Sequence, residues 1–229
     1  MKRFFTTLLA ASMMLAGTSA FAQISVGFGY LGSPEKLSAT KMDIEKSFYM
    51  NGLYAGFDNT IQFDKNMGMS VGVYYVYSAA SASQMFDYLE LIESFAKGRL
   101  DEHFINIPVN IVFGTDVQNG LRAFFFAGPT VSCGLSSKVK ANVLDILKFN
   151  ASDNYKHDYF ERFDLLFGGG IGMDINSKIR IKAGYDYGLF NRIGDGLTIK
   201  NRDGVEVLAT NEKADLHRSQ ITVGVSYLF

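Results

Sequence analysis

The chain has 229 residues, of which 48% are apolar and 20% charged, and its formal net charge is −1. This length suggests one domain or at most two, and the apolar share excludes a disordered or collagen-like chain. There is no basic surplus that would favour nucleic acid as a partner. The 20 phenylalanines, 12 tyrosines and 23 glycines, with only three prolines, favour β-structure over a helical bundle. The single cysteine, Cys133, excludes an intrachain disulfide framework and a CxxC metal or redox site.

The first residues have the order of a secretory signal peptide. Met1-Lys2-Arg3 is basic, residues 4–15 are mostly apolar, and Ala20-Phe21-Ala22 offers the small-x-small pattern of a cleavage site. The alternative is a buried N-terminal helix. We predict a signal peptide over residues 1–22 and a mature chain that begins at Gln23. After residue 22 no uninterrupted apolar stretch reaches about 18 residues, so we expect export without a transmembrane helix.

Eight segments alternate between apolar and polar residues with the period of two that is typical of a strand with two different faces. The C-terminal segment shows it best, with Ile221, Val223, Val225 and Tyr227 on one face. The segments lie at 23–30, 52–63, 67–77, 105–113, 121–133, 162–175, 178–187 and 220–229. The fifth is the least regular, because Phe124 and Phe126 fall on its polar face.

The connections between these segments alternate in length. Those at 64–66, 114–120 and 176–178 are short, and those at 31–48, 78–102, 134–160 and 191–217 are long. An antiparallel barrel with tight turns at one rim and long loops at the other has this rhythm. Strands of about ten residues also match the span of a tilted transmembrane strand. The prediction is an all-β, eight-stranded, antiparallel up-and-down transmembrane β-barrel with four long outer loops, over residues 23–229.

The choice between a membrane barrel and a soluble, lipocalin-like barrel depends on which face is inside. The polar face also carries the glycines, and the other face carries Phe, Tyr, Ile, Val and Met on almost every strand. Eight strands leave an interior only just wide enough for side chains, so the bulky face fits the outside better. Tyr75, Tyr77, Tyr185 and Tyr187 near the long loops, and Phe63, Phe113, Tyr227 and Phe229 near the short turns, suit two interfacial girdles. We therefore predict that the apolar face points outward, into lipid.

Several local strings carry a family resemblance. Phe104-Ile105-Asn106-Ile107-Pro108-Val109, Ala127-Gly128-Pro129 and the glycine-rich strand from Phe163 to Gly172 resemble the small outer-membrane β-barrel domain of exported bacterial proteins, including the PorT-like group. The ending is similar to an outer-membrane assembly signal, in which Val223, Val225, Tyr227 and Phe229 take part. The resemblance implies an eight-stranded barrel with no common catalytic residues. It also implies partners: outer-membrane lipid, the barrel-assembly machinery and, for some relatives, a secretion complex.

The polar face is predicted to form a network of paired charges inside the barrel, because an unpaired buried charge is costly. Pairing across the 176–178 turn places Asp174 near Lys178 or Arg180, and Asp186 can meet Arg162 or Asp164. The predicted members of this network are Asp58, Asn106, Asn110, Arg122, Arg162, Asp164, Asp174, Arg180, Lys182 and Asp186. The two interpretations are an ion pathway and a salt-bridged plug in a solid barrel, and the narrow interior favours the plug.

No reaction is indicated. Lipid-modifying outer-membrane enzymes use a His with a Ser and an acid near the outer rim, and here Ser219 follows His217 and Glu102 precedes His103. Such residues are also common polar groups of a rim. The three histidines, His157 included, have no metal-ligand spacing, and residues 168–172 lack the GK[ST] of a phosphate loop. We expect no catalytic residue, no metal and no cofactor.

The long loops contain local patterns of their own. Met85, Leu89, Ile92 and Ala96 predict one amphipathic helix, and Val139, Val143, Ile146 and Leu147 predict another. Residues 197–199 and 205–207 flank a hairpin signal at 201–204. These segments form either a binding surface for an extracellular or secretion-complex protein, or a cap on the barrel mouth. The sequence thus predicts an exported outer-membrane barrel with a structural or loop-mediated binding role; a narrow pore, a secretion-complex component and a lipid-modifying enzyme are the alternatives.

Overall fold

The structure is a computed structural model of the chain, and it describes residues 22–39, 44–81, 96–118, 120–143, 147–153, 161–192, 198–200, 206–209 and 214–229. Within these ranges every regular element is a β-strand. Among the described residues, no helix has the length and apolarity needed to cross a membrane. The predicted signal peptide lies outside the described residues, apart from Ala22.

Eight long strands form the wall of the molecule. They are β1 (Ala22–Ala39), β2 (Ile44–Gln62), β3 (Met67–Ser81), β4 (Ala96–Gln118), β5 (Leu121–Val143), β7 (Phe163–Ile175), β8 (Ile179–Gly188) and β11 (Ala214–Leu228). Three short strands, β6 (Leu147–Asp153), β9 (Thr198–Lys200) and β10 (Glu206–Ala209), lie in the connections.

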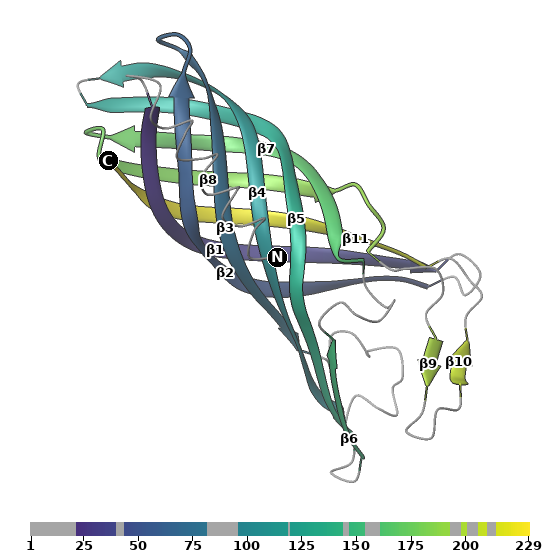
Figure 1. The fold of residues 1–229 in the computed structure, drawn as a ribbon. Helices are drawn as coiled ribbons and strands as arrows, with labels where there is room; N and C mark the ends of the chain where they lie inside the picture. The colour runs from purple at the N-terminus through teal and green to yellow at the C-terminus, as the bar shows by residue number, and fades with distance from the viewer. Residues whose placement is uncertain are drawn as a thin grey trace, which may run out of the picture.

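The eight wall strands close into an antiparallel barrel (Figure 1). Each pairs with the next wall strand along the chain, and β11 pairs with β1 to complete the ring. Closure gives each wall strand a hydrogen-bonded neighbour on both sides, as a strand in lipid requires. The predicted eight-stranded up-and-down barrel is confirmed.

The barrel has two different ends. Its short-turn end carries the turns around 63–66, Gly120 and 176–178 and both Ala22 and Phe229, and its long-loop end carries the other connections. In the turn after β7, Asn176 and Ser177 have φ values of 51° and 54°, and the Asn176 N–H donates to the Gly120 carbonyl at 2.6 Å. Asn is one of the few residues that tolerates this left-handed conformation. The two turns thereby support each other at the rim.

The strands are tilted because the pairing is staggered. Following the backbone pairs once round the wall from Ala22 leads back to β1 at Gly32, which is ten residues further along the same strand. With about 3.3 Å per residue and about 4.8 Å between strands, this stagger gives a tilt of about 40°. Such a barrel is narrow enough for side chains to fill its interior.

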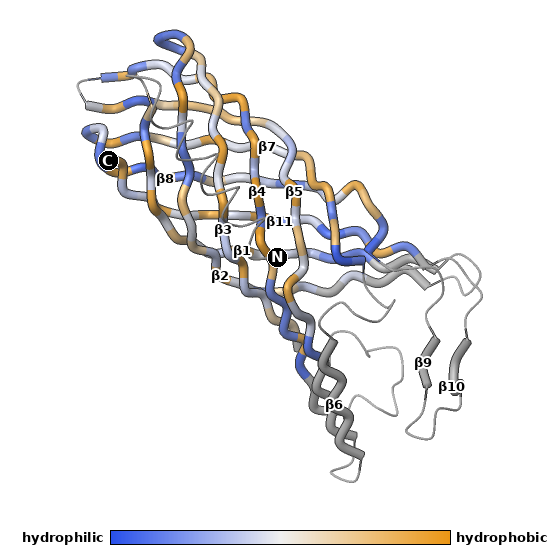
Figure 2. Tube along the Cα trace, in the orientation of Figure 1, coloured by the Kyte–Doolittle hydropathy of each residue, from blue (hydrophilic) through white to orange (hydrophobic). Residues whose placement is uncertain are grey.

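The apolar face points outward. Phe167 is 56% exposed, Val223 50% and Ile181 38%, whereas Arg180 is 3% exposed and Asp174 5%. Figure 2 shows polar and apolar residues following one another along the wall strands. In a soluble barrel these exposures would be reversed, so the structure excludes the lipocalin-like alternative.

The inner face contains aromatic rings packed over glycines. Phe124 and Phe126, which interrupt the predicted polar face, point inward and lie against the backbone of β7 and β8. A Cβ at Gly172 would overlap the Phe124 ring, and a Cβ at Gly224 would overlap the Tyr54 side chain. The strand glycines therefore make room for large rings in the lumen.

Several predicted loop boundaries are wrong. β1 continues to Ala39 and β2 begins at Ile44, within the predicted loop 31–48, and β4 begins at Ala96, within the predicted loop 78–102. The ladders continue because backbone pairing does not need an apolar face, so the end of the alternation does not mark the end of a strand.

The elements predicted within the long loops compare differently with the structure. The helix predicted from Val139, Val143, Ile146 and Leu147 is wrong, because β5 continues to Val143 and pairs with β6 from Leu147 onward. β-branched residues suit a strand better than a helix. The predicted hairpin is confirmed by the pairing of β9 with β10. The helix on Met85, Leu89 and Ile92 lies outside the described residues, and Ala96 begins β4.

Candidate functional site

The polar residues predicted to share one face lie on the inner side of the wall. Asp58, Asn106, Asp164, Asp174 and Arg180 are buried. The other members are half-buried: Asn110, Arg122, Arg162, Lys182 and Asp186. They are not one cluster, because the lumen groups them at two levels with aromatic rings between.

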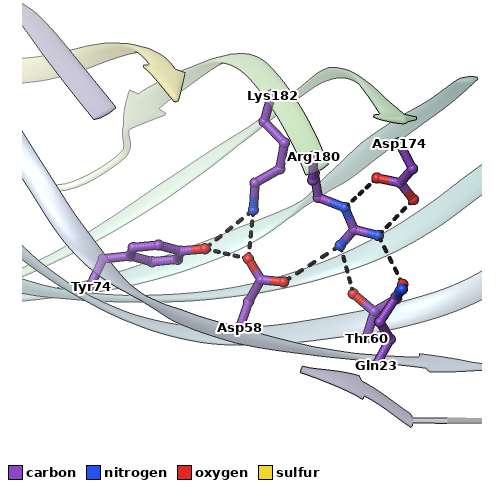
Figure 3. Close-up of polar contacts among 7 residues, drawn as sticks. All are labelled: Gln23, Asp58, Thr60, Tyr74, Asp174, Arg180 and Lys182. Atoms are coloured by element: carbon purple, nitrogen blue, oxygen red, sulfur yellow. Dashed lines mark hydrogen bonds and ion pairs between the residues drawn. The ribbon is translucent and has the colours of Figure 1, made fainter. Parts of the chain in front are cut away.

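The first level lies near the short-turn end and centres on Arg180 (Figure 3). Its guanidinium binds both carboxylate oxygens of Asp174, with Nε to Oδ1 at 2.7 Å and Nη2 to Oδ2 at 2.9 Å. Nη1 donates to Thr60 Oγ1 at 3.0 Å and lies 3.6 Å from Asp58 Oδ1. Since Asp58 and Thr60 are on β2, and Arg180 and Asp174 on β8 and β7, the contacts cross the lumen.

A second cation completes this level. Lys182 Nζ donates to Asp58 Oδ2 at 2.7 Å and to the Tyr74 hydroxyl at 3.2 Å, and Tyr74 itself donates to Asp58. Two cations thus meet two carboxylates, and the charge balances. The Arg180 guanidinium also lies 4.9 Å from the centre of the Phe124 ring, so an aromatic face closes its remaining side.

The second level lies at the long-loop end and centres on Arg192, which follows β8. Its Nη1 donates to Glu35 at 2.7 Å and its Nη2 to Glu102 at 2.8 Å. All three side chains are at most 2% exposed. Arg192 therefore joins β1 to β4 across the mouth of the barrel.

Beside it, Arg218 donates to Ser132 Oγ at 2.7 Å and lies 3.4 Å from Asp164 Oδ2. The Phe104 ring lies between the two guanidiniums, with its centre 5.3 Å from Arg192 and 4.3 Å from Arg218. Three carboxylates, those of Glu35, Glu102 and Asp164, lie around these two arginines.

Burial changes the ionisation of Glu35. The residue lies beyond the apolar band of the wall, since its neighbour on the outer face, Lys36, is an exposed cation. Burial raises the pKa of the Glu35 carboxyl to about 7, and the Glu102 carboxylate acts in the same direction, although Arg192 and Arg218 oppose the change. The mouth can therefore hold one proton near neutral pH.

Sequence reasoning placed Asp164 in the luminal network but did not place four other members of this level there: Glu35, Glu102, Arg192 and Arg218. The first three fall in segments assigned to loops, and Arg218 lies between the last loop and the last predicted strand. A usable signal was present, because the inward positions of β1 continue with the same period of two from Leu31 through Ser33 to Glu35.

Between the two levels the lumen is mostly filled. Asn106 Nδ2 donates to Gln220 Oε1 at 3.1 Å, and Leu31, Val76 and Phe104 form a small apolar cluster beside Tyr54. A cavity of about 80 Å³ remains, and Lys182, Asp186 and Asn110 line it. Asp186 lies opposite Gly168 and Gln220 in the pairing register, not opposite Arg162 or Asp164.

The histidines that the structure describes do not form a catalytic arrangement with the predicted partners. His103 lies on the outer face against Tyr75 and Tyr77, whereas Glu102 points inward to Arg192. His217 stacks on Tyr187, and Ser219 is hydrogen-bonded to the Tyr185 hydroxyl at 3.0 Å. Adjacent residues of a strand point to opposite faces, which separates His103 from Glu102. His157 lies outside the described residues.

Within the described ranges, no group of His, Cys, Asp or Glu could hold a metal ion. The residues of the predicted assembly signal lie on the outer face of β11: Val223, Val225, Tyr227 and Phe229. The Phe229 N–H donates to the Ile24 carbonyl at 2.9 Å, which places the end of the chain at the β1–β11 seam.

Comparison with known proteins gives a family and distant structural likenesses. The model of the outer membrane protein beta-barrel domain matches residues 18–194. No curated protein matches the chain. Among solved structures, the chain is similar to the attachment invasion locus protein Ail of Yersinia pestis, in complex with a heparin analogue, at 12% identity and a TM-score of 0.44, covering 91% of this chain and 99% of that chain.

Two further solved structures illustrate the range of such barrels. The outer membrane protein OprG of Pseudomonas aeruginosa is 13% identical with a TM-score of 0.45, and the outer membrane protease OmpT of Escherichia coli is 8% identical with a TM-score of 0.44. Each likeness covers 93% of this chain and 98% of the other chain.

Proposed function

Because the chain belongs to the outer membrane protein beta-barrel domain family, we propose that it acts in the outer membrane as a closed scaffold. It binds partners with the segments at its long-loop end and carries out no catalysis. The family places it among outer-membrane barrels, and the role within that class is the proposal.

The observation that carries the proposal is the pair of charge networks that cross the lumen. Arg180 joins β8 to β7 and β2, and Arg192 joins β1 to β4. Each guanidinium is almost fully buried, and large rings fill the space between the levels. An eight-stranded barrel filled in this way supports a closed scaffold over a pore.

The binding half of the proposal is supported by the shape of the long-loop end. β4 and β5 stay paired up to Ala96 and Val143, and β1 and β2 up to Ala39 and Ile44, past the exposed apolar band. Figure 1 shows these two sheets separating beyond the barrel. Sheets that project from a rigid wall are a suitable base for a recognition surface.

Export and location are part of the same proposal. Residues 1–22 serve as the signal peptide, the termini face the periplasm of a Gram-negative cell, and membrane lipid and the assembly machinery are obligatory partners. Cell fractionation together with the mass of the purified N-terminal peptide tests this. A protein recovered from the cytoplasm with residues 1–22 attached would contradict it.

Planar-bilayer recording tests the closed lumen. The purified protein is expected to give no steady single-channel current. A variant with both Arg180→Ala and Asp174→Ala, which removes two side chains that fill the lumen, serves as the comparison. Steady currents from the unaltered protein, reduced when bulky residues are added to the lumen, would support the narrow pore instead.

Co-purification from mildly solubilised membranes tests the binding role. A variant that lacks residues 139–151 removes the end of β5 and part of β6 but leaves every β5–β7 pair in place. A partner lost with this deletion supports binding at the long-loop end. Retention of the same partner would refute it, and a set of secretion proteins in the purified material would favour the PorT-like alternative, a secretion-complex component.

A further inference from the structure

The short-turn end contains an open polar vestibule of about 670 Å³, which borders the Arg180 network. Amide and charged side chains from β1, β2, the following turn, β4 and β5 line it, and Asp174 lies at its inner end. The lining residues that matter here are Gln23, Gln62, Lys65, Asp116, Gln118 and Arg122.

The vestibule has a surplus of positive charge. Asp174 lies opposite Arg122 in the pairing register, but both of its oxygens are bound by Arg180. Among the described residues, the Arg122 guanidinium donates one long hydrogen bond, 3.5 Å to the Lys65 carbonyl oxygen, and Arg122 lies opposite Asp116 in the β4–β5 register. Arg122 and Lys65 thus share one lining carboxylate that Arg180 does not bind, Asp116, whereas the cations deeper in the lumen are paired with carboxylates.

A free strand edge borders the same vestibule. The β3–β4 ladder starts at Met67 and Phe113, and the Gly114 N–H donates to the Asn66 carbonyl at 2.8 Å. β4 continues to Gln118, and on its β3 side residues 115–118 have no backbone partner within the described chain. Backbone groups alternate along a regular strand, and the β4–β5 register is regular from Phe113 to Asp116 before it shifts. The N–H of Asp116 therefore points to this open side, as that of Gly114 does.

The outer side of this edge is apolar. A surface hollow of about 780 Å³ begins at this edge with Asn66, Gly114 and Thr115, and it continues away from the edge over the apolar outer face of β5, β7 and β8. The edge therefore has cations on its inner side and the end of an apolar hollow on its outer side. Side chains of an added strand would alternate between these two environments.

We propose that the short-turn mouth binds an extended peptide with a carboxylate. The peptide adds as a strand to β4 at Asp116, as in other cases of strand addition to an exposed sheet edge. Its carboxylate pairs with the Arg122 guanidinium, whose planar fork matches a carboxylate, and with Lys65. Its alternate apolar side chains lie on the outer side of the wall, at the end of the hollow formed by Asn66 and Thr115. In the orientation proposed above such a partner is periplasmic, but binding itself does not depend on that orientation.

The test uses the full-length barrel in detergent and a labelled peptide, acetyl-Thr-Val-Thr-Val-Glu, with a free or an amidated C-terminus and with Glu or Gln at its end. Fluorescence anisotropy measures binding. The doubly acidic peptide is expected to bind saturably, and the amidated Gln form more weakly by about tenfold or more. Equal binding of the two peptides, or no saturable binding, would overturn the proposal.

Variants distinguish the contribution of the Arg122 charge from that of the open edge of β4. Arg122→Gln is expected to weaken binding of the acidic peptide by about tenfold, and Asp116→Asn to strengthen it, because the competing carboxylate is removed. Asp116→Pro removes the open N–H and should abolish binding of both peptides. Arg99→Gln, at the long-loop end, is the matched control. Each variant is first checked for folding by its heat-modifiable migration on a gel, and binding unchanged by Arg122→Gln in a folded barrel contradicts the proposal.

Discussion

At the scale of single residues, the Arg180 guanidinium shows how a charge can be buried inside the barrel. It uses all three nitrogens on Asp174, Thr60, Gln23 and Asp58, and it covers the Phe124 ring. A buried ion pair adds little net stability, but the removal of one partner leaves an uncompensated charge. The network therefore fixes the arrangement of strands more than it strengthens the fold.

Replacement of this arginine tests that view. Arg180→Met is expected to lower the free energy of unfolding by about 3–5 kcal/mol, because Asp174 and Asp58 lose their shared cation. Addition of Asp174→Leu should restore much of the loss. The urea midpoint of the heat-modifiable band measures both variants. Arg99→Gln, which breaks an exposed pair with Asp101, should leave stability nearly unchanged.

Glu35 predicts a dependence on pH. Folding raises the pKa of this carboxyl from 4.5 to about 7, so the folded barrel takes up a proton between these values. The contribution of Glu35 to stability is therefore fully present below pH 4.5 and is lost as the pH rises through 7. Thermal midpoints between pH 4 and pH 8 should fall across this window in the native protein.

The Glu35→Gln variant is the matched control, because it keeps an acceptor for Arg192 but cannot titrate. Its thermal midpoint should lose the part of the slope between pH 4.5 and 7 and be at least as high as that of the native protein at pH 8. A slope that persists unchanged in this variant would assign the pH dependence to another carboxyl.

At the scale of elements, the alternation of residues predicted the wall and the direction of its faces. The period of two is enough to decide which side chains share a face, so Asp174 and Arg180 could be placed together from the turn at 176–178. It could not predict that Glu35 meets Arg192, because that contact joins a strand to a residue beyond the last regular position of β8. Contacts across the lumen depend on the stagger of the whole ring, which no single segment specifies.

The contact between Phe124 on β5 and Gly172 on β7 gives a further prediction. Gly172→Ala should destabilise the barrel by about 1–3 kcal/mol, because the new methyl group overlaps the Phe124 ring. Phe124→Leu in the same chain should relieve part of this cost, so the effects of the two changes should not add. Unfolding in urea of the two single variants and the double variant measures the coupling. Additive effects would mean that the ring and the glycine are independent.

At the scale of the whole molecule, the outward apolar band predicts a dependence on depth. Ile171 is 68% exposed and pairs with Phe125 and Ala183 near the middle of the band, whereas Ile179 lies at the short-turn rim. Ile171→Lys should cost about 2–4 kcal/mol in lipid and Ile179→Lys about 0–1 kcal/mol. Reversible unfolding in lipid vesicles measures both. Equal costs would be inconsistent with a band that spans hydrocarbon.

The barrel closes where the first wall strand to be synthesised, β1, pairs with the last, β11. Before residues 214–228 emerge from the ribosome, the growing chain has nothing with which to complete the circle. Until then, the earlier segments keep unpaired backbone edges and apolar side chains exposed to water. We therefore expect that a chain truncated ahead of β11 is degraded by proteases instead of accumulating as a smaller barrel.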